Sequence, residues 1–345
     1  MSDIKVNSIR SLNGANGPEI SGTVEMNSTG AMSLPRGDTA YRGSRGRGLF
    51  AGGYVSPAVI NTIQYVTIAT TGNALDFGDL TEAIGDRQGW GSSTRGLFAG
   101  GLNSPTRVNT IDFVTISSTG NAFDFGDLTE ENFQGAALSN EVRGLYGGGI
   151  NPSTRLTQID LINNASKGNA STFGNLSSRR FALTAFSSPT RGLFAGGDSQ
   201  TPVRVNIIEY VTISSEGNTI DFGDMLAISR NKMAAASSTR GVIGGGDDGT
   251  GAGGITAIDY VTIASLGDSI DFGDLTQGRR RGSGLSNSIR GIFGGGYTAP
   301  SPSVSYDIID FVTIASTGNA ADFGNLLSTD HRLGTAASDS HGGLG

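Results

Sequence analysis

The chain of 345 residues has no cysteine, only three lysines, two histidines and one tryptophan. The lack of cysteine excludes disulfides, thiolate metal ligands and a cysteine nucleophile. Histidine is the usual acid–base residue and a common metal ligand, and both histidines lie in the last fifteen residues. We therefore expect a protein that is not an enzyme and that holds no cofactor and no metal.

Positive charge is also scarce. The net charge is −7 and charged residues make up only 16% of the chain, which argues against nucleic acid as a partner. No apolar run approaches the roughly 18 residues of a membrane span, so membrane insertion is not expected. The first residues lack the apolar core of a signal peptide, which predicts synthesis in the cytoplasm.

Glycine is abundant, with 55 residues, and much of it falls in one repeated phrase. The phrase runs Arg-Gly, an aliphatic, an aromatic or aliphatic residue, a small residue, and Gly-Gly. Its copies begin at Arg47, Arg95, Arg143, Arg191, Arg240 and Arg290, which lie 48, 48, 48, 49 and 50 residues apart. A period of this length with strand-like content is typical of a β-propeller with one four-stranded blade per repeat. The sequence predicts an all-β protein with six blades.

Each repeat supplies four predicted strands. In the first copy these are residues 48–53, 61–69, 74–80 and 88–94, named b, c, d and then a of the next blade. Strand c is β-branched and aromatic, as a sheet covered on both faces requires. Strand a is rich in Gly, Ala and Ser, which suits the crowded axis. Three residues per copy are the predicted core. They are Ile63, Ile111, Ile159, Ile208, Ile258 and Ile309; Tyr65, Phe113, Leu161, Tyr210, Tyr260 and Phe311; and Phe77, Phe125, Phe173, Phe222, Phe272 and Phe323.

The unfinished last copy predicts how the ring closes. In every copy the strand-d Asp lies 13 residues after the strand-c Ile; the third copy has Thr172 in place of this Asp. The next Arg lies 19 residues after that position, and in the last copy this count ends at His341. The first blade begins at strand b and lacks strand a. Residues 332–340 have the spacing and small side chains to supply it, which would remove an exposed edge. We expect a propeller over residues 42–345 and a short β-rich docking or oligomerising arm over residues 1–41.

Length variation is confined to the loop between strands b and c. In an up-and-down blade this loop emerges on the same face as the d–a segment, whose residues vary at constant length. Binding usually lies on loops carried by a rigid scaffold, so this face is the predicted ligand-binding face. Its candidate residues are Tyr54, Asn103, Arg107, Asn151, Arg180, Asp198, Asp247, Asp248, Arg279, Arg280, Arg281 and Tyr297.

Two features have a functional and a structural interpretation. The six repeated arginines could ring a channel and bind an anion, or each could bond a neighbouring turn carbonyl or strand-d carboxylate; we favour the second. Residues 247–251, Asp-Asp-Gly-Thr-Gly, offer oxygen ligands for Ca²⁺ but lack a distal carboxylate at the required spacing. We favour a solvated turn there.

The blade pattern resembles the kelch family, which has an aliphatic strand ending in a Gly pair, as at residues 52–53, followed by an aromatic in the next strand. It departs from kelch where that family has a Trp, because Trp90 falls in strand a. The phrase Arg-Gly-Leu-Phe-Ala-Gly-Gly is also similar to repeats of bacteriophage virion proteins, notably phages of cyanobacteria. Residues 5–9 and 30–42 resemble the start of phage tail-fibre proteins.

These resemblances imply a bacteriophage virion structural protein, as a tail-fibre or tail-tip adhesin that binds a host-surface glycan or protein receptor. The arm would dock to other virion proteins, and the chain could form a homo-oligomer. The protein would be made in the host cytoplasm and act outside the cell, on the virion. One alternative is a non-adhesive component, such as a baseplate or capsid decoration protein. Another is a carbohydrate-active enzyme, because carboxylates occur in every blade.

Overall fold

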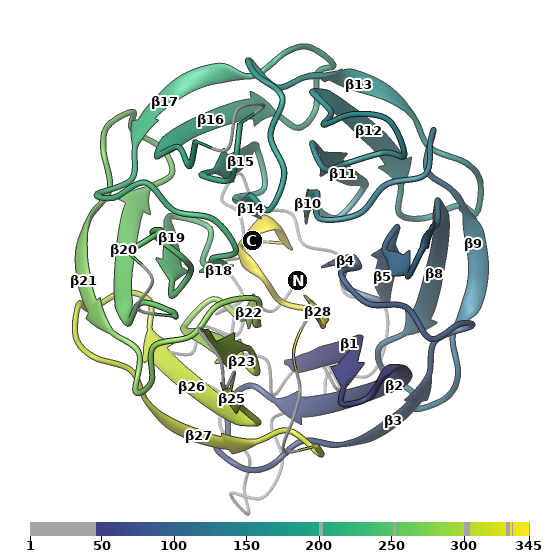
Figure 1. Cartoon of the computed structure of the whole chain (residues 1–345), viewed down its shortest axis with the longest axis horizontal. Helices are drawn as coiled ribbons and strands as arrows, with labels where there is room; N and C mark the ends of the chain where they lie inside the picture. Colours follow the sequence, from purple (N-terminus) through teal and green to yellow (C-terminus); the bar gives the residue numbers. More distant parts are fainter. Residues whose placement is uncertain are drawn as a thin grey trace, which may run out of the picture. The chain divides into compact units, whose positions relative to one another are not determined.

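The computed structural model describes residues 46–199, 203–250, 253–299, 304–328, 332 and 334–344. The predicted arm, residues 1–41, lies outside the described residues. Within them the chain forms six four-stranded antiparallel sheets, arranged as blades around a central axis (Figure 1). This confirms the predicted all-β six-bladed propeller.

The innermost strand of each blade is short and made mostly of small residues. In blades 1 to 6 these strands are β28 (Thr335–Ser338), β4 (Gln88–Gly91), β10 (Ala136–Ser139), β14 (Thr184–Ser187), β18 (Met233–Ala236) and β22 (Ser283–Ser286). Small side chains let neighbouring inner strands approach closely enough for hydroxyl groups to link them. The Ser139 hydroxyl donates to the Gly91 carbonyl oxygen at 2.7 Å, and Ser187 donates to Ser139 at 2.6 Å.

The second strand of each blade carries the repeated phrase. In the same blade order these strands are β1 (Arg47–Val55), β5 (Arg95–Ala99), β11 (Arg143–Gly147), β15 (Arg191–Ala195), β19 (Arg240–Gly244) and β23 (Arg290–Gly294). In blades 2 to 6 the Gly pair follows this strand at once, whereas in blade 1 it lies within β1. In blade 2 Gly100 and Gly101 have φ of +63° and +117°. Only glycine adopts such angles without strain. The pair turns the chain away from the sheet toward the b–c loop.

The third strands are buried at the core isoleucine and at the residue that follows it, and are more exposed toward their ends. They are β2 (Ala58–Thr67), β8 (Thr110–Thr115), β12 (Gln158–Asn163), β16 (Ile207–Thr212), β20 (Ala257–Thr262) and β26 (Ile308–Thr313). The predicted isoleucine row is confirmed as core, because all six members have 0% exposure. The row two residues further on, also predicted as core, packs against the core clusters but is only partly buried, as Tyr65 shows. Its members lie near the rim, where a guanidinium group covers the ring in place of an apolar neighbour.

The outermost strands carry the predicted phenylalanines, which are 2–3% exposed and so confirmed as core. These strands are β3 (Leu75–Asp79), β9 (Phe123–Asp127), β13 (Ser171–Asn175), β17 (Ile220–Asp224), β21 (Ile270–Asp274) and β27 (Ala321–Asn325). Each is tied to the c–d turn of the next blade. For example, the Gly120 amide donates to the Phe77 carbonyl at 2.8 Å, and the Asp79 amide donates to Asn121 Oδ1 at 3.1 Å.

The ring closes in blade 1 as predicted. Strand β28 pairs with β1, and Ser338 lies opposite Gly48. One detail of the expected spacing is wrong. Ser286 and Ser338 are equivalent last residues of inner strands, but Ser286 lies fifteen positions after Asp271, whereas Ser338 lies sixteen positions after Asp322. The closing segment therefore has one extra residue, and the position due for an arginine falls on Gly342 rather than His341.

The chain turns into the axis after this closing strand. A 3-10 turn, η2 (Gly342–Leu344), lies against inner strands β10, β14 and β18. His341 Nε2 donates to the Gly91 carbonyl at 2.8 Å, and Nδ1 accepts from the Gly343 amide at 3.1 Å. Burial lowers the pKa of His341, which favours this neutral ring. Gly342 has no room for a side chain, because a Cβ would collide with the Ser187 and Ser237 carbonyls.

Candidate ligand-binding face

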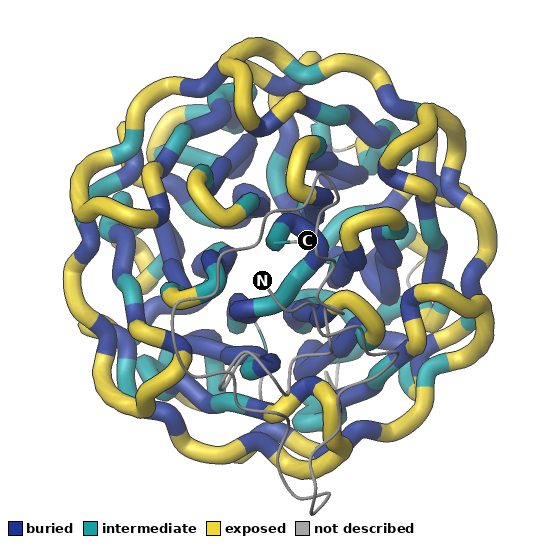
Figure 2. Tube along the Cα trace, turned by 180° about the vertical axis from the view of Figure 1, so that it is seen from behind, coloured by how far each residue is buried: buried dark blue, intermediate teal, exposed yellow. Residues whose placement is uncertain are grey.

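The b–c loops and the d–a segments lie side by side, as predicted. In each of blades 2 to 6 a residue that precedes the inner strand forms a backbone bridge with a residue after the Gly pair, and Arg332 bridges to Tyr54 in blade 1. The bridges are Gly85–Leu102, Phe133–Ile150, Phe181–Asp198, Arg230–Asp247, Arg280–Tyr297 and Tyr54–Arg332. We call this end of the ring the variable face. The opposite end, formed by the a–b and c–d turns, is the uniform face (Figure 2).

Two of the b–c loops add small hairpins to the variable face. In blade 2 the hairpin consists of β6 (Leu102–Asn103) and β7 (Thr106–Arg107), and in blade 6 of β24 (Tyr297–Thr298) and β25 (Val304–Ser305). The candidate Asn103 is exposed at the first of these. Candidate Arg107 stacks over the Phe133 ring, with its guanidinium carbon 5.0 Å from the ring centroid.

The six repeated arginines belong to the uniform face and have the structural role that we favoured. Each donates to a main-chain carbonyl at the end of the third strand of the next blade. The acceptors of Arg47, Arg95, Arg143, Arg191, Arg240 and Arg290 are the carbonyls of Ile116, Asn164, Ile213, Ile263, Ile314 and Ile68, at 2.9–3.3 Å. Five of these arginines also stack over an aromatic ring of their own blade, such as Arg240 over Tyr260 at 4.3 Å. They join blades together.

A second set of cations lies buried beneath the variable face. Arg87 pairs with Asp112 at 2.6 Å, Arg180 with Glu209 at 2.6 Å, and Arg279 with Asp310 at 2.8 Å. The candidates Arg180 and Arg279 are 0% exposed, so the structure moves them from the ligand-binding surface to the interior. Burial lowers the pKa of Arg180, and the charge of Glu209 opposes this change.

The acidic partners of these cations show a pattern that the sequence interpretation missed. The residue that follows the core isoleucine is polar in all six copies and almost fully buried: Gln64, Asp112, Asp160, Glu209, Asp259 and Asp310. Most of these side chains accept a hydrogen bond from the second residue after the outer strand of the preceding blade. For example, Asp112 accepts from the Thr81 amide at 3.2 Å. A polar residue fixed between two apolar positions was the available signal.

Blade 3 lacks the buried cation. At the two positions that supply a cation in other blades it has Asn132 and Gly135, and Asp160 has no ion-pair partner among the described residues. The Tyr146 ring stands where blades 2 and 4 have Phe98 and Phe194, and it packs against Gly135. Burial raises the pKa of Asp160, and hydrogen bonds from Gln158 and Thr129 lower it by a smaller amount.

Candidate Asp247 is the centre of a charged network. Its carboxylate accepts from Arg204 at 3.0 Å, from Arg230 at 3.2 Å, and from Arg280. Candidate Asp198 joins through Arg230 at 2.5 Å. Burial opposes ionisation of Asp247, but the Arg204 hydrogen bond, the Gly249 amide and the arginine charges outweigh it and lower its pKa to about 2.

This network also bears on the calcium interpretation of residues 247–251. Asp247 Oδ2 accepts from guanidinium groups, and its Oδ1 accepts from the Gly249 amide at 3.0 Å. Asp248 Oδ1 accepts from the Thr250 hydroxyl at 2.8 Å within the turn. Across the described residues, no group of three or more His, Cys, Asp or Glu could hold a metal ion. The turn interpretation agrees with this geometry.

Three further candidates, Tyr54, Tyr297 and Asn151, contact residues of the d–a segments. Tyr54 stacks with Arg332 at 4.6 Å, and Tyr297 stacks with Arg332 at 5.1 Å and with Arg280 at 5.0 Å. The structure thus brings candidates of blades 1 and 6 together around one guanidinium. Asn151 is separate: its amide donates to Glu130 at 2.7 Å, and its Oδ1 accepts from the Thr154 amide at 2.7 Å.

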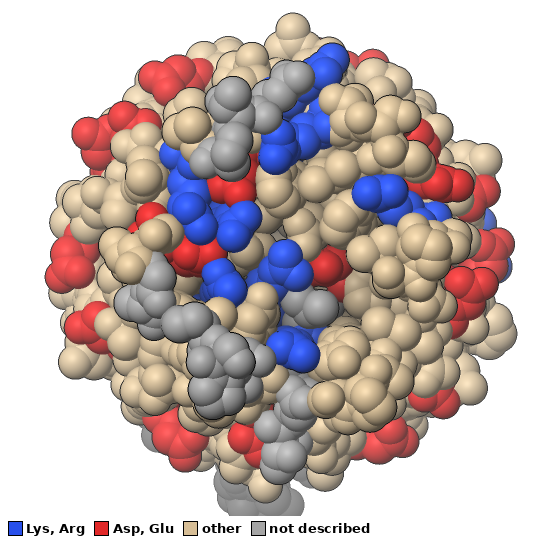
Figure 3. Space-filling view, viewed as in Figure 1, with Lys and Arg blue, Asp and Glu red and all other residues tan. Residues whose placement is uncertain are grey.

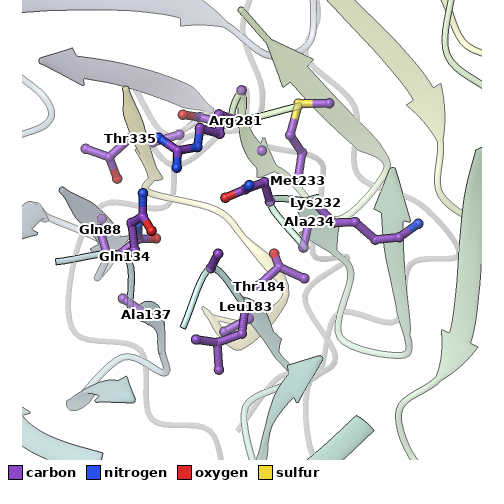
Figure 4. Close-up of a pocket in the computed structure, with 18 of the residues that line it drawn as sticks. Gln88, Gln134, Ala137, Leu183, Thr184, Lys232, Met233, Ala234, Arg281 and Thr335 are labelled. Atoms are coloured by element: carbon purple, nitrogen blue, oxygen red, sulfur yellow. The ribbon is translucent and has the colours of Figure 1, made fainter. Parts of the chain in front are cut away.

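A cavity of about 100 Å³ opens at the axis on the variable face (Figure 4). Candidate Arg281 lines it, together with Asp86 and Gln134, which sequence reasoning did not identify. Gln134 Nε2 donates to Asp86 Oδ2 at 3.2 Å, and Arg281 Nη1 lies 3.5 Å from the same oxygen. Figure 4 shows Arg281 and Gln134 extending into the same space, whereas Lys232 points away from it. Lys232 pairs with Asp259 at 3.8 Å.

Charge is unevenly distributed on this face. In Figure 3 the Lys and Arg side chains gather around the centre, and most Asp and Glu side chains lie toward the periphery. The chain as a whole carries a charge of −7. The centre of the variable face is therefore positive on an acidic protein, which favours an approaching anion.

The described residues thus define a six-bladed β-propeller with one variable, positively charged face. Comparison with known proteins assigns no family: no family model matches the chain, and none of the curated proteins matches it. In the described part of the chain, no helix is long and apolar enough to cross a membrane.

Proposed function

We propose that this protein is the receptor-binding component of a bacteriophage virion, a tail-fibre or tail-tip adhesin that displays its propeller to a host-surface glycan or protein. The observation that carries the proposal is the contrast between the faces. The loops of unequal length, the partly exposed arginines and the axial cavity all lie on one face. On the other face, equivalent residues of all six blades form the same inter-blade bonds.

The likeness of the repeated phrase Arg-Gly-Leu-Phe-Ala-Gly-Gly to repeats of bacteriophage virion proteins, and of residues 5–9 and 30–42 to tail-fibre proteins, supports the virion as the location. In this proposal residues 1–41 dock to other virion proteins, and the variable face points outward. A scaffold that holds variable loops in fixed positions suits recognition, because the loops can differ without any cost to the ring.

The test is attachment of the fluorescently labelled full-length protein to host cells. In the test variant, segments 248–254 and 298–305 are exchanged for the short loop of blade 2, which leaves Asp247 and Tyr297 in place. The control is Glu216→Ala, an exposed residue in a c–d turn of the uniform face. We expect the loop exchange to abolish attachment and the control to retain it.

Other results would contradict the adhesin proposal. Assembly of the wild-type protein into particles without any attachment to cells would favour a baseplate or decoration role. Release of sugar from surface polysaccharide by the purified protein would favour a carbohydrate-active enzyme. Immunogold labelling of particles, which shows whether the propeller lies at a tail tip, separates these outcomes from a failure of the cell assay.

A further inference from the structure

Five equivalent residues around the axial cavity have the left-handed backbone conformation, which is uncommon outside glycine. Asp86, Gln134, Ala182, Asn231 and Arg281 all have φ of 54–56°. This conformation strains most non-glycine residues, because Cβ comes close to the following carbonyl oxygen, and Asp and Asn tolerate it best. It places main-chain groups so that neighbours bond around the axis: the Ala182 amide donates to the Gln134 carbonyl at 2.7 Å, and the Asn231 amide donates to Ala182 at 2.8 Å.

Glycine would meet this backbone requirement at least strain, yet none of the five positions has it. The same chain uses glycine at every copy of its Gly pair, so the repeat supplies glycine where only the backbone matters. The five side chains also differ from one another, whereas residues that hold the ring together are repeated almost unchanged. All five line the cavity. Strain of this kind is concentrated at functional sites.

The side chains around the cavity form an asymmetric set of polar groups on a pseudo-symmetric ring. Arg281 offers a fork of donors, and its one ion-pair partner among the described residues is Asp86, at 3.5 Å. Asp86 supplies an acceptor, and Gln88, Gln134 and Asn231 supply amides that both donate and accept. Such a mixture matches a ligand that has several hydroxyl groups and one anionic group.

The surroundings favour a negative ligand. Arg230 pairs with both Asp198 and Asp247, and Arg280 pairs with Asp247. Arg332 stacks on the rings of Tyr54 and Tyr297. The arginine side chains of the Asp247 network are 17–27% exposed, so their charge reaches solvent. The cavity therefore opens into a positive region, although Asp86 within it is acidic.

We propose that the axial cavity binds the acidic terminal sugar of a surface glycan, with Arg281 pairing with the sugar carboxylate. The amides of Gln134 and Asn231 and the carboxylate of Asp86 bond its hydroxyl groups. A volume of about 100 Å³ admits one small group rather than an oligosaccharide. This inference rests on the proposed function, because it names the ligand class of the same face.

Titration calorimetry on the full-length protein tests it, with D-glucuronic acid, D-glucose and inorganic phosphate as probes. We expect glucuronic acid to bind. Glucose should bind with at least about tenfold lower affinity, because it lacks the carboxylate and a hydrogen bond to a charged group contributes about that factor or more to affinity. Phosphate carries charge without the hydroxyl pattern and should also bind more weakly. Equal binding of phosphate and glucuronic acid would overturn the sugar assignment.

Two substitutions locate the site. Arg281→Gln should lower the affinity for glucuronic acid roughly tenfold or more, while thermal unfolding stays near that of the wild type because the side chain makes one long ion pair. Arg179→Gln removes the same charge from an exposed position on the same face, outside the cavity. Equal loss in both variants, or no loss in Arg281→Gln, contradicts the cavity as the site.

The cell assay keeps this inference separate from the proposed function. Glucuronic acid binding that depends on Arg281, without attachment to any host cell, would leave the cavity assignment standing and contradict the adhesin. The opposite result is attachment that the loop exchange abolishes and Arg281→Gln leaves unchanged, with no binding of glucuronic acid. It would contradict the cavity assignment and leave the adhesin standing.

Discussion

Arginine is the main cation on both faces of the propeller, and the two faces use it differently. On the uniform face six arginines occupy one position of the repeat, and each bonds a main-chain carbonyl in the next blade. On the variable face no arginine position is repeated in all six blades: Arg107, Arg155 and Arg204 share one position in blades 2 to 4, and Arg230, Arg280 and Arg332 share another in blades 5, 6 and 1. Three of them converge on Asp247, and one lines the axial cavity.

The difference shows how a repeat protein allows structure to be separated from function within one sequence. A contact that every blade needs is repeated six times, because every interface between blades poses the same packing problem. A ligand is bound once per ring, so the residues that contact it need not be the same in each blade. Among the six copies, similarity marks the scaffold, and difference at a surface position marks a candidate for binding.

The largest expected effect comes from opening the ring, on whose closure both faces depend. Deletion of the residues after 328 removes β28 and exposes the β1 edge, and we expect the truncated protein to aggregate. Size-exclusion chromatography with light scattering measures this. A truncated protein that stays monomeric and unfolds cooperatively would contradict closure by β28.

The next effect lies under the variable face, where a cation is buried and therefore structural. Asp112→Asn leaves Arg87 without its charged partner at 1% exposure, and should cost about 3–5 kcal/mol in the free energy of unfolding. Urea denaturation gives the value. A cost below about 1 kcal/mol would mean that solvent reaches Arg87 and that it belongs with the surface cations.

A smaller effect is expected for one repeated arginine. Arg240→Gln removes the bond to the Ile314 carbonyl and the stack on Tyr260, at a cost of about 1–2 kcal/mol. Cell attachment should not change below the unfolding temperature. Arg281→Gln should show the opposite combination, with stability kept and ligand binding lost. If both variants changed the same property, the contrast between the faces would fail.

The smallest effect concerns Asp160, a buried carboxyl group without an ion-pair partner among the described residues. Because burial raises the pKa of Asp160 in the folded protein, its charge destabilises the fold above that pKa, and the penalty disappears as the pH falls below the unfolded value, about 3.9. Asp160→Asn should therefore raise stability on the order of 0.5 kcal/mol at neutral pH. Gln64 shows that blade 1 accommodates a neutral amide at this position, where it accepts from the Leu327 amide at 2.7 Å.

Denaturant unfolding of this variant at several pH values checks the sign. The gain over the wild type should shrink as the pH is lowered toward 4. A gain that stays constant with pH would assign the effect to packing rather than to charge, and a loss at neutral pH would show that the Asp160 hydrogen bonds outweigh its burial.

Most of the scaffold could be predicted because its determinants are local and repeated. The spacing of Arg47, Ile63 and Phe77 within one copy indicates three strands, and six copies indicate the ring. Depth along a strand could not be predicted this way. Ile63 and Tyr65 lie two residues apart in one strand, yet only Ile63 is fully covered, because the end of the blade is near.

The site was harder to predict because its residues act through partners far along the chain. Arg180 looks like a solvated loop charge until Glu209, 29 residues later, is seen to face it. The left-handed residues of the axial ring share no residue type, so no motif identifies them. What the sequence did indicate was the face: Arg281 and the Asp247 network lie where the variable loops predicted a binding surface.

The turn at Gly342–Leu344 has a consequence for how a polymer could be recognised. It lies against the inner strands of blades 3, 4 and 5 and lines the axial space at the uniform face, which it narrows on that side. In the proposed binding mode this obstruction favours a ligand that enters from the variable face by a chain end over one that passes through the ring. The number of binding events would then follow the number of chain ends on a cell and not the length of the chains, and a ligand would leave by the path along which it entered.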